Sequence, residues 1–177
     1  MIQDGLYRFH PKQDLHYVLV RDIASDQGVR TAIHHKDRTL LEQSVFYLEG
    51  CPKPAFPTSF YIRVASSKYP NSYLKWHDNA QFTFEKKDAS DDGGFLFRFD
   101  FADNNWRNDP KIRTPAGEGW ELIGNPVTGK NVDVAGGQIF HLSPVVGWGF
   151  TGGDNQQWFA ERMPNETQKI IDQSGPH

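Results

Sequence analysis

The chain has 177 residues, which is enough for one domain with a substantial core. Its formal net charge is −3 and it contains no run of five or more Lys or Arg, so its charge gives no reason to expect nucleic acid as a partner. Thirteen Phe, six Tyr and five Trp stand against two Met, which favours large rings on β-strands and predicts an all-β protein.

Short apolar and aromatic runs, bounded by Pro, Asp, Gly or charged residues, predict four strands in each third of the chain. The first four are expected at 6–9, 17–20, 29–34 and 43–48. The next four are expected at 60–65, 73–76, 82–85 and 95–101, and the last four at 120–123, 131–134, 139–142 and 157–160. The chain is therefore expected to contain three repeats of similar size.

Three units of four strands are too few for a propeller, and each unit is too long for a β-helix. We therefore predict a closed, twelve-stranded β-trefoil that forms a single domain over 1–163. Its repeats are expected at about 4–50, 58–103 and 118–163, and the connections 51–57 and 102–119 are rich in Pro, Asn and Gly. The C-terminal tail, 164–177, shows little apolar periodicity, so we expect it to be frayed or loosely docked.

Features that indicate enzymatic chemistry are missing from the sequence. It has no nucleophile elbow, phosphate-binding glycine loop or H-E-x-x-H helix, which predicts a non-enzymatic binding protein without a cofactor. His34 and His35 are adjacent on an expected strand and would point to opposite faces, so no metal site is predicted. Cys51 is the single cysteine, which excludes an internal disulfide.

The N-terminus has no basic region followed by an apolar run, so no secretory signal is visible. No apolar stretch approaches the roughly 20 residues that a membrane-spanning helix needs. We therefore expect a cytoplasmic protein without membrane insertion, unless it leaves the cell by an unconventional route.

The third repeat contains Val132-Asp133-Val134, then Gly136-Gly137, and later Asn155-Gln156-Gln157-Trp158. This pattern resembles the sugar-binding repeat of ricin-B-type β-trefoil lectins. The resemblance implies that Asp133, Asn155 and Gln156 bind sugar hydroxyls beneath a stacking aromatic ring. The family's ring position falls near Leu142 in this chain, which leaves Phe140 and His141 as the candidates.

The first two repeats have Val18-Leu19-Val20 and Tyr73-Leu74-Lys75-Trp76 at the Asp position, so at most one sugar site is expected. Structure alone also offers an explanation for the motif. Trp158 is then a core residue, and Gln156 satisfies backbone groups whether or not a sugar binds.

A second resemblance extends over more of the chain and points to the mycocypins, fungal β-trefoil inhibitors of cysteine proteases. It rests on Asp4-Gly5-Leu6-Tyr7-Arg8, on Leu40-Leu41-Glu42-Gln43, and on Pro144-Val145 and Gly152-Gly153-Asp154 in the third repeat. The resemblance implies inhibition through surface loops on a rigid barrel.

In mycocypins, the loops after the first and third strands meet papain-like proteases, and an Asn in the loop after the fifth strand blocks legumain-like proteases. Carried over to this chain, these loops supply the candidates Pro11, Lys12, Gln13, Asp14, Lys36, Asp37, Arg38, Tyr69, Pro70 and Asn71. The family's glycine pair is missing from the first loop, where 11–14 stand in its place.

Protease inhibition is the preferred interpretation of the sequence, because its resemblance runs through all three repeats. The alternative is a ricin-B-like lectin that binds glycans at one site in the third repeat. A structural or interaction trefoil with neither activity stays open as a third possibility.

Overall fold

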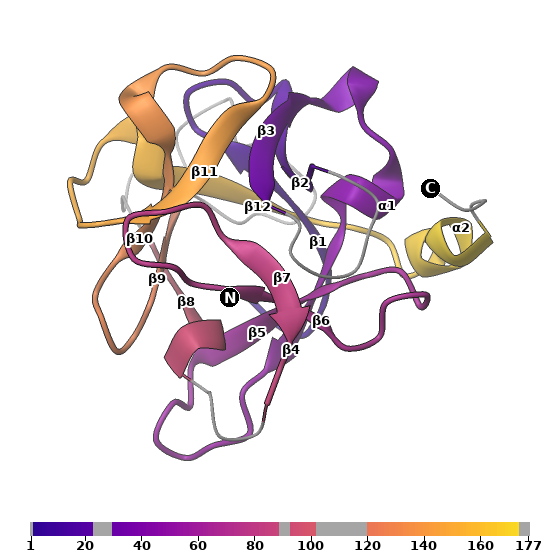
Figure 1. The fold of residues 1–177 in the computed structure, drawn as a ribbon. Helices are drawn as coiled ribbons and strands as arrows, with labels where there is room; N and C mark the ends of the chain where they lie inside the picture. The colour runs from indigo at the N-terminus through magenta and orange to yellow at the C-terminus, as the bar shows by residue number, and fades with distance from the viewer. Residues whose placement is uncertain (1, 23–29, 89–92, 102–119, 174–177) are drawn as a thin grey trace.

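The structure is a computed structural model that describes residues 2–22, 30–88, 93–101 and 120–173. The linker expected at 102–119 lies outside these residues. The described chain contains twelve strands and two α-helices, which confirms the all-β prediction (Figure 1). The strands are β1 (Gly5–Pro11), β2 (Tyr17–Arg21), β3 (Thr31–His35), β4 (Phe46–Gly50), β5 (Ser59–Val64), β6 (Ser72–Lys75), β7 (Thr83–Lys86), β8 (Phe97–Phe101), β9 (Trp120–Gly124), β10 (Asn131–Val134), β11 (Ser143–Trp148) and β12 (Gln157–Arg162).

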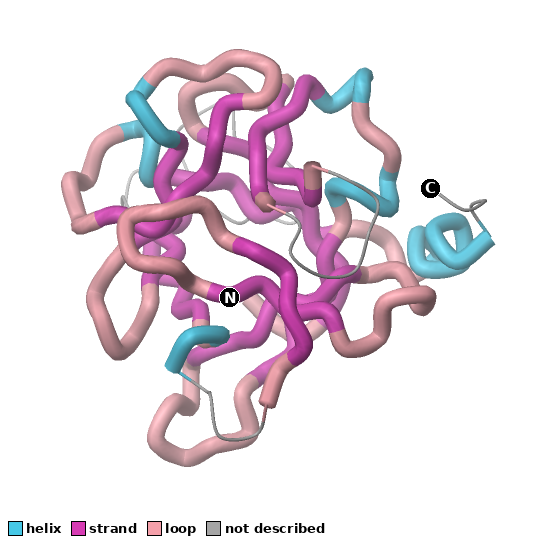
Figure 2. Tube along the Cα trace, viewed as in Figure 1, coloured by secondary structure: helices cyan, strands magenta, loops and turns pink. Residues whose placement is uncertain are grey.

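Six of the strands close into an antiparallel ring. β1 pairs with β4 and β12, β5 pairs with β4 and β8, and β9 pairs with β8 and β12. Every strand of this ring therefore has a partner on both sides, which removes the free edges that an open sheet would present. Figure 2 shows the strands gathered in the middle of the molecule with loops around them.

The other six strands form three hairpins, β2–β3, β6–β7 and β10–β11. Each hairpin bonds to the other two. Ser143 of β11 pairs with Ile33 of β3, Gln81 next to β7 bridges to Val146 of β11, and Arg30 next to β3 bridges to Thr83 of β7. The hairpins therefore cap the ring as one connected layer.

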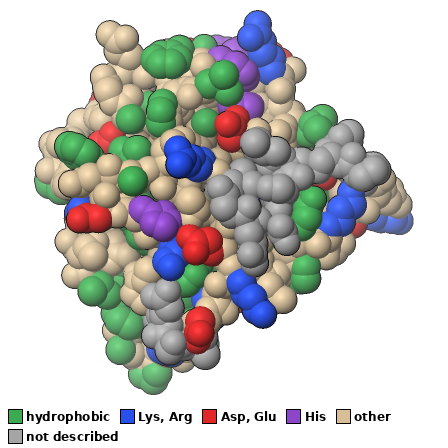
Figure 3. All heavy atoms as spheres, viewed as in Figure 1, with side chains coloured by type: hydrophobic (Ala, Val, Ile, Leu, Met, Phe, Trp, Pro, Cys, Tyr) green, Lys and Arg blue, Asp and Glu red, His purple; other side chains and the backbone are tan. Residues whose placement is uncertain are grey.

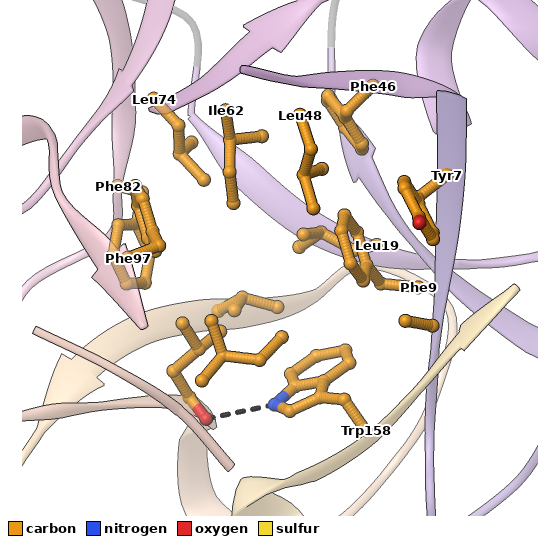
Figure 4. Close-up of a cluster of buried hydrophobic side chains, with 14 of the residues drawn as sticks. Tyr7, Phe9, Leu19, Phe46, Leu48, Ile62, Leu74, Phe82, Phe97 and Trp158 are labelled. Carbon is orange, nitrogen blue, oxygen red and sulfur yellow. Dashed lines mark hydrogen bonds between the residues drawn. The ribbon is translucent and has the colours of Figure 1, made fainter. Parts of the chain in front are cut away.

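Large side chains from all three repeats fill the interior, and several of them face one another in Figure 4. Phe46 stacks on Phe84 with ring centroids 5.7 Å apart, and Phe9 lies 6.3 Å from Phe46. Trp158 is fully buried, and its indole N–H donates to the Val132 carbonyl at 3.0 Å, the dashed line in Figure 4. Burial together with a satisfied indole donor confirms the interpretation of Trp158 as a core residue.

The strand expected at 139–142 was wrong, because this segment is a turn and β11 begins at Ser143. The Ser143 hydroxyl accepts the Phe140 N–H at 3.0 Å and donates to the Gln138 carbonyl at 3.3 Å. Leu142 adopts a φ of 78°, in the left-handed region that an extended strand excludes. The Ser143 side chain therefore holds the turn closed, and backbone pairing with β3 begins at Leu142, whose N–H donates to the Ile33 carbonyl at 2.6 Å.

The start of the fourth expected strand is also different. Residues 41–44 form the short helix α1 (Leu41–Ser44), and β4 follows it. The Gln43 side chain accepts the Leu40 N–H at 3.2 Å, and the Gln43 N–H donates to the Leu40 carbonyl. This reciprocal pair of bonds favours a helical turn over an extended start.

The tail was expected to be frayed or loosely docked, and its described residues contain the helix α2 (Glu166–Gln173). Ile171 is fully buried and packs in a small cluster with Leu6, Val45 and Ala65. Gln168 donates to the Ala65 carbonyl at 2.7 Å. One apolar anchor and this bond together dock the helix on the barrel.

Candidate functional site

A cavity of about 520 Å³ opens beside the β10–β11 hairpin, a size in the usual range for small-molecule sites. Its polar walls come from Asp133, Asn155, Thr151 and Asn79. Its apolar walls include Val146 and Trp148, and the turn Ala135–Gly137 completes it. The cavity therefore combines amide and carboxylate groups with an aromatic ring.

Strand alternation explains why these side chains meet. Val132 and Val134 of β10 point into the core, so Asp133 points to the other face. On β11, Val146 pairs with Asp133, and Trp148 pairs with Asn131. The carboxylate of Asp133 and the ring of Trp148 therefore lie on the same face of one hairpin.

Two amides hold the Asp133 carboxylate. Asn155 Nδ2 donates to Oδ1 at 3.1 Å, and Gln156 Nε2 donates to Oδ2 at 2.8 Å. Burial raises the pKa of Asp133 above its ordinary value, although these two hydrogen bonds oppose the rise. Each carboxylate oxygen can accept a second hydrogen bond, so a hydroxyl donor in the cavity has an acceptor available.

Gln156 was a candidate for sugar contact, but the structure places it behind the wall rather than in it. The side chain is fully buried. Its Nε2 also donates to the Gly149 carbonyl at 2.8 Å, while its Oε1 accepts the N–H groups of Thr151 at 2.8 Å and Gly152 at 3.3 Å. Gln156 therefore positions Asp133 and the loop before β12, which confirms that its amide satisfies backbone groups.

Phe140 and His141 were the expected aromatic partners, but neither lines the cavity. The His141 ring packs on His34 with centroids 4.5 Å apart. Histidine side chains, in purple, gather near the top of the face that Figure 3 shows. Phe140 is exposed in the turn before β11. The family's ring position, near Leu142, falls in the turn that precedes β11, at the opposite end of this strand from Trp148.

The ring that lines the cavity is Trp148, which the sequence reasoning missed. It lies at the end of β11, and 46% of its surface is exposed. Buried Val145 and Gly147 alternate with Val146 and Trp148 along this strand. With the strand placed at 143–148, this alternation alone would have put Trp148 on the same face as Asp133.

The first two candidate protease loops lie together. Lys12 bonds to Gln157 at 3.2 Å and to Asp154 at 3.4 Å, and Gln13 donates to the Gly137 carbonyl at the cavity wall. Lys36, Asp37 and Arg38 form an exposed 3₁₀ turn, and the Lys36 N–H donates to the His16 carbonyl at 2.8 Å. These two loops are therefore joined at one end of the β2–β3 hairpin.

The third candidate loop lies at the other end of that hairpin. Tyr69 packs its ring 4.9 Å from the Arg21 guanidinium, at the last residue of β2. Pro70 and Asn71 are exposed beside it. Arg21 lies four positions after Tyr17 on β2, which is about 13 Å at the usual rise of a strand. A surface that binds papain-like proteases and an Asn71 that blocks legumain-like proteases would therefore be two separate sites.

On β2 and β6, the first strands of the corresponding hairpins, no carboxylate lies on the face away from the core. Val18 and Val20 of β2 are buried there in a cluster with Ala32. In the second repeat Leu74 of β6 is a core residue, so its neighbours Tyr73 and Lys75 face the other way. Neither of these hairpins offers the combination found around Asp133.

Two features of the described residues bear on other functions. No helix there is both long and apolar enough to cross a membrane. Within the same residues, no three His, Cys, Asp or Glu side chains come together in a way that could hold a metal ion.

The sequence matches no protein-family model, and no curated protein aligns with it. Structural similarity is clear. A mosquitocidal holotoxin matches 94% of this chain with a TM-score of 0.72 and 14% identity, but the chain spans only 18% of its length. The Polyporus squamosus lectin, bound to Neu5Acα2-6Galβ1-4GlcNAc, matches 92% of the chain with a TM-score of 0.63 and 14% identity, and the chain spans 50% of it.

A ricin B-like lectin from Macrolepiota procera, in complex with lactose, matches 92% of this chain and 99% of its own, with a TM-score of 0.61 and 18% identity. The fold is a β-trefoil. This confirms the predicted trefoil. The third repeat differs slightly from a regular four-stranded unit, because β10 is joined to β9 through one residue pair rather than a full ladder. The mycocypin resemblance stays a prediction from sequence.

Proposed function

We propose that this trefoil is a glycan-binding lectin with one sugar site, formed in the third repeat by Asp133, Asn155 and Trp148. The observation that carries the proposal is the arrangement in the cavity, where a carboxylate held by two amides lies beside a half-exposed indole ring. A sugar combines hydroxyl groups with an apolar face of C–H bonds. The carboxylate accepts from a hydroxyl, the amide bonds to a second one, and the indole packs on the apolar face.

Two further facts support glycan binding over protease inhibition. Lectins in complex with lactose and with a sialylated trisaccharide share the fold over nearly the whole of this chain. The candidate inhibitory loops carry exposed polar residues, as solvated loops commonly do. Among the described residues, no feature of these loops indicates protease binding in particular. Glycan binding thus becomes the main hypothesis, and inhibition stays the alternative.

A glycan array tests the proposal directly. The unmodified protein should bind at least one glycan, and Asp133→Ala should weaken that binding about 10- to 100-fold, the usual cost of losing a hydrogen bond to a charged group. Asp154→Ala is the matched control, because Asp154 is exposed, adjacent to Asn155 and outside the cavity.

Thermal unfolding of each variant establishes that the fold persists. An array without binding, or equal losses for Asp133→Ala and Asp154→Ala, would overturn the proposal. Inhibition of papain-like or legumain-like proteases by the same preparation would then favour the alternative.

A further inference from the structure

A second cavity, of about 360 Å³, lies next to the sugar site. Three segments far apart in the sequence form it. They are 76–78 between β6 and β7, 93–94 before β8, and 125–130 in the β9–β10 hairpin. Its size also falls in the usual range for small-molecule sites, and none of its residues lines the first cavity.

The two cavities share one wall. Asn79 lines the first cavity and its neighbour Asp78 lines the second. The Lys130 ammonium group joins both of them, because it donates to Asn79 Oδ1 at 2.9 Å and pairs with the Asp78 carboxylate. Lys130 is three residues before Asp133, about 10 Å along the strand. A ligand in the first cavity therefore needs only to pass Asn79 to reach the second.

This wall is fixed to the strand that carries the sugar-site ring. Gly147 lies between Val146 and Trp148, and its N–H donates to the Ala80 carbonyl at 3.1 Å. A Cβ at Gly147 would come within 3.0 Å of the Trp76 ring and 3.2 Å of the His77 carbonyl. Glycine thus permits a close approach of the two segments. Because the wall is held in place, a ligand that crosses it meets two preformed cavities.

The second cavity offers surface that suits another sugar residue. Val127 is 60% exposed and supplies an apolar wall. His77 also lines this cavity. Its ring is fixed by contacts of Nε2 with Thr83 Oγ1 at 2.6 Å and with Glu85 Oε2 at 3.2 Å. Asp78 offsets the charge of Lys130. The cavity therefore favours a neutral group with both hydroxyls and an apolar face.

From this geometry we infer that the second cavity is a subsite for a further residue of the same glycan chain. The preferred ligand is then a neutral oligosaccharide that extends past Asn79, rather than a monosaccharide. This inference rests on the proposed function, because the first cavity must hold the end of the chain.

Titration calorimetry tests it with the strongest oligosaccharide from the array and with its fragments, shortened one sugar at a time. The unmodified protein should bind the longest ligand about tenfold more tightly than the terminal monosaccharide, which corresponds to one additional favourable contact region. Val127→Asp replaces the apolar wall with a hydrated carboxylate and should bring that ratio close to one. Leu40→Asp is the matched control, since Leu40 is an exposed aliphatic residue outside both cavities and Asp is a good residue at its helix N-cap position.

The results separate the inference from the function on which it rests. A protein that binds neither the oligosaccharide nor its fragments would overturn both. Binding of equal strength for long and short ligands would overturn the subsite alone, as would an unchanged ratio in Val127→Asp. A ratio lost in Val127→Asp and kept in Leu40→Asp would support it.

Discussion

The β10–β11 and β2–β3 hairpins occupy corresponding places in the third and first repeats, yet they present different chemistry. Both are antiparallel and both help to cap the barrel. On β10 a carboxylate points away from the core toward Asn155, whereas Val18 and Val20 of β2 are buried with Ala32. The fold requires the pairing and the inward-facing residues, so the other face of each hairpin can differ between repeats.

The core shows the opposite behaviour. Phe46 pairs with Tyr7 across β4 and β1, and Trp158 pairs with Glu121 across β12 and β9, so the two residues hold corresponding places in the first and third repeats. Both side chains are fully buried in one cluster. Either one fills the barrel with an aromatic ring. The trefoil is therefore close to symmetric in what stabilises it and asymmetric in what it can bind.

Truncating these two core rings should produce the largest effects. Trp158→Ala and Phe46→Ala should each lower the free energy of unfolding by about 3–5 kcal/mol, because a fully buried aromatic leaves a cavity that the barrel cannot close. Denaturant unfolding followed by circular dichroism measures both. A much smaller loss of unfolding free energy for Phe46→Ala than for Trp158→Ala would show that the repeats contribute unequally to stability. It would contradict the symmetry argued for the core.

Much of the fold was predictable because strand alternation and aromatic content are local signals. Strands such as β2 and β10 lie within one residue of their expected limits. The turn before β11 was not predictable, since it depends on the Ser143 hydroxyl and on a left-handed Leu142. The helix α2 has a single fully buried residue, Ile171, which is too short a pattern to indicate a period.

The site divides in the same way. Asp133 and Asn155 were found through a family resemblance, and the structure joins them with a hydrogen bond. Trp148 was missed because the strand that carries it was displaced. The second cavity has no local signal at all, because its walls come from three connections that only the closed barrel brings together.

Removing the indole ring of Trp148 should have the next largest effect, and it should act on binding rather than on stability. Trp148→Ala should weaken glycan binding about 30-fold, in line with the roughly 2 kcal/mol or more that a central aromatic contributes to binding. Its effect on the free energy of unfolding should stay within about 0.5 kcal/mol, because the side chain is half exposed. Calorimetric titration and denaturant unfolding measure the two effects separately.

Phe150→Ala is the matched control for that ring. Phe150 is 66% exposed, lies two residues further along the chain and does not line the cavity. Its truncation should leave glycan affinity within about twofold of the original. Equal losses for the two variants would mean that general surface hydrophobicity, rather than the ring of the third repeat, determines binding.

The smallest expected effect is a pH dependence of glycan affinity, caused by the Asp133 carboxylate of the third repeat. Burial raises the pKa of Asp133, and the hydrogen bonds from Gln156 and Asn155 only partly oppose this. The ionised carboxylate accepts hydrogen bonds, so glycan affinity should be complete above the raised pKa and should fall several-fold as the pH drops through it. The fall should therefore begin at a higher pH than an aspartate with the ordinary value of 3.8 would give.

The same shift has the opposite sign for stability. A folded-state pKa above the unfolded value means that protonation of Asp133 favours the folded state, so this group cannot cause unfolding over the range in which affinity is lost. Asp133→Asn does not titrate, and its weaker affinity should stay level over that range while tryptophan fluorescence reports an intact fold. If the affinity of Asp133→Asn falls with pH as steeply as that of the unmodified protein, the carboxylate is not the group on which binding depends.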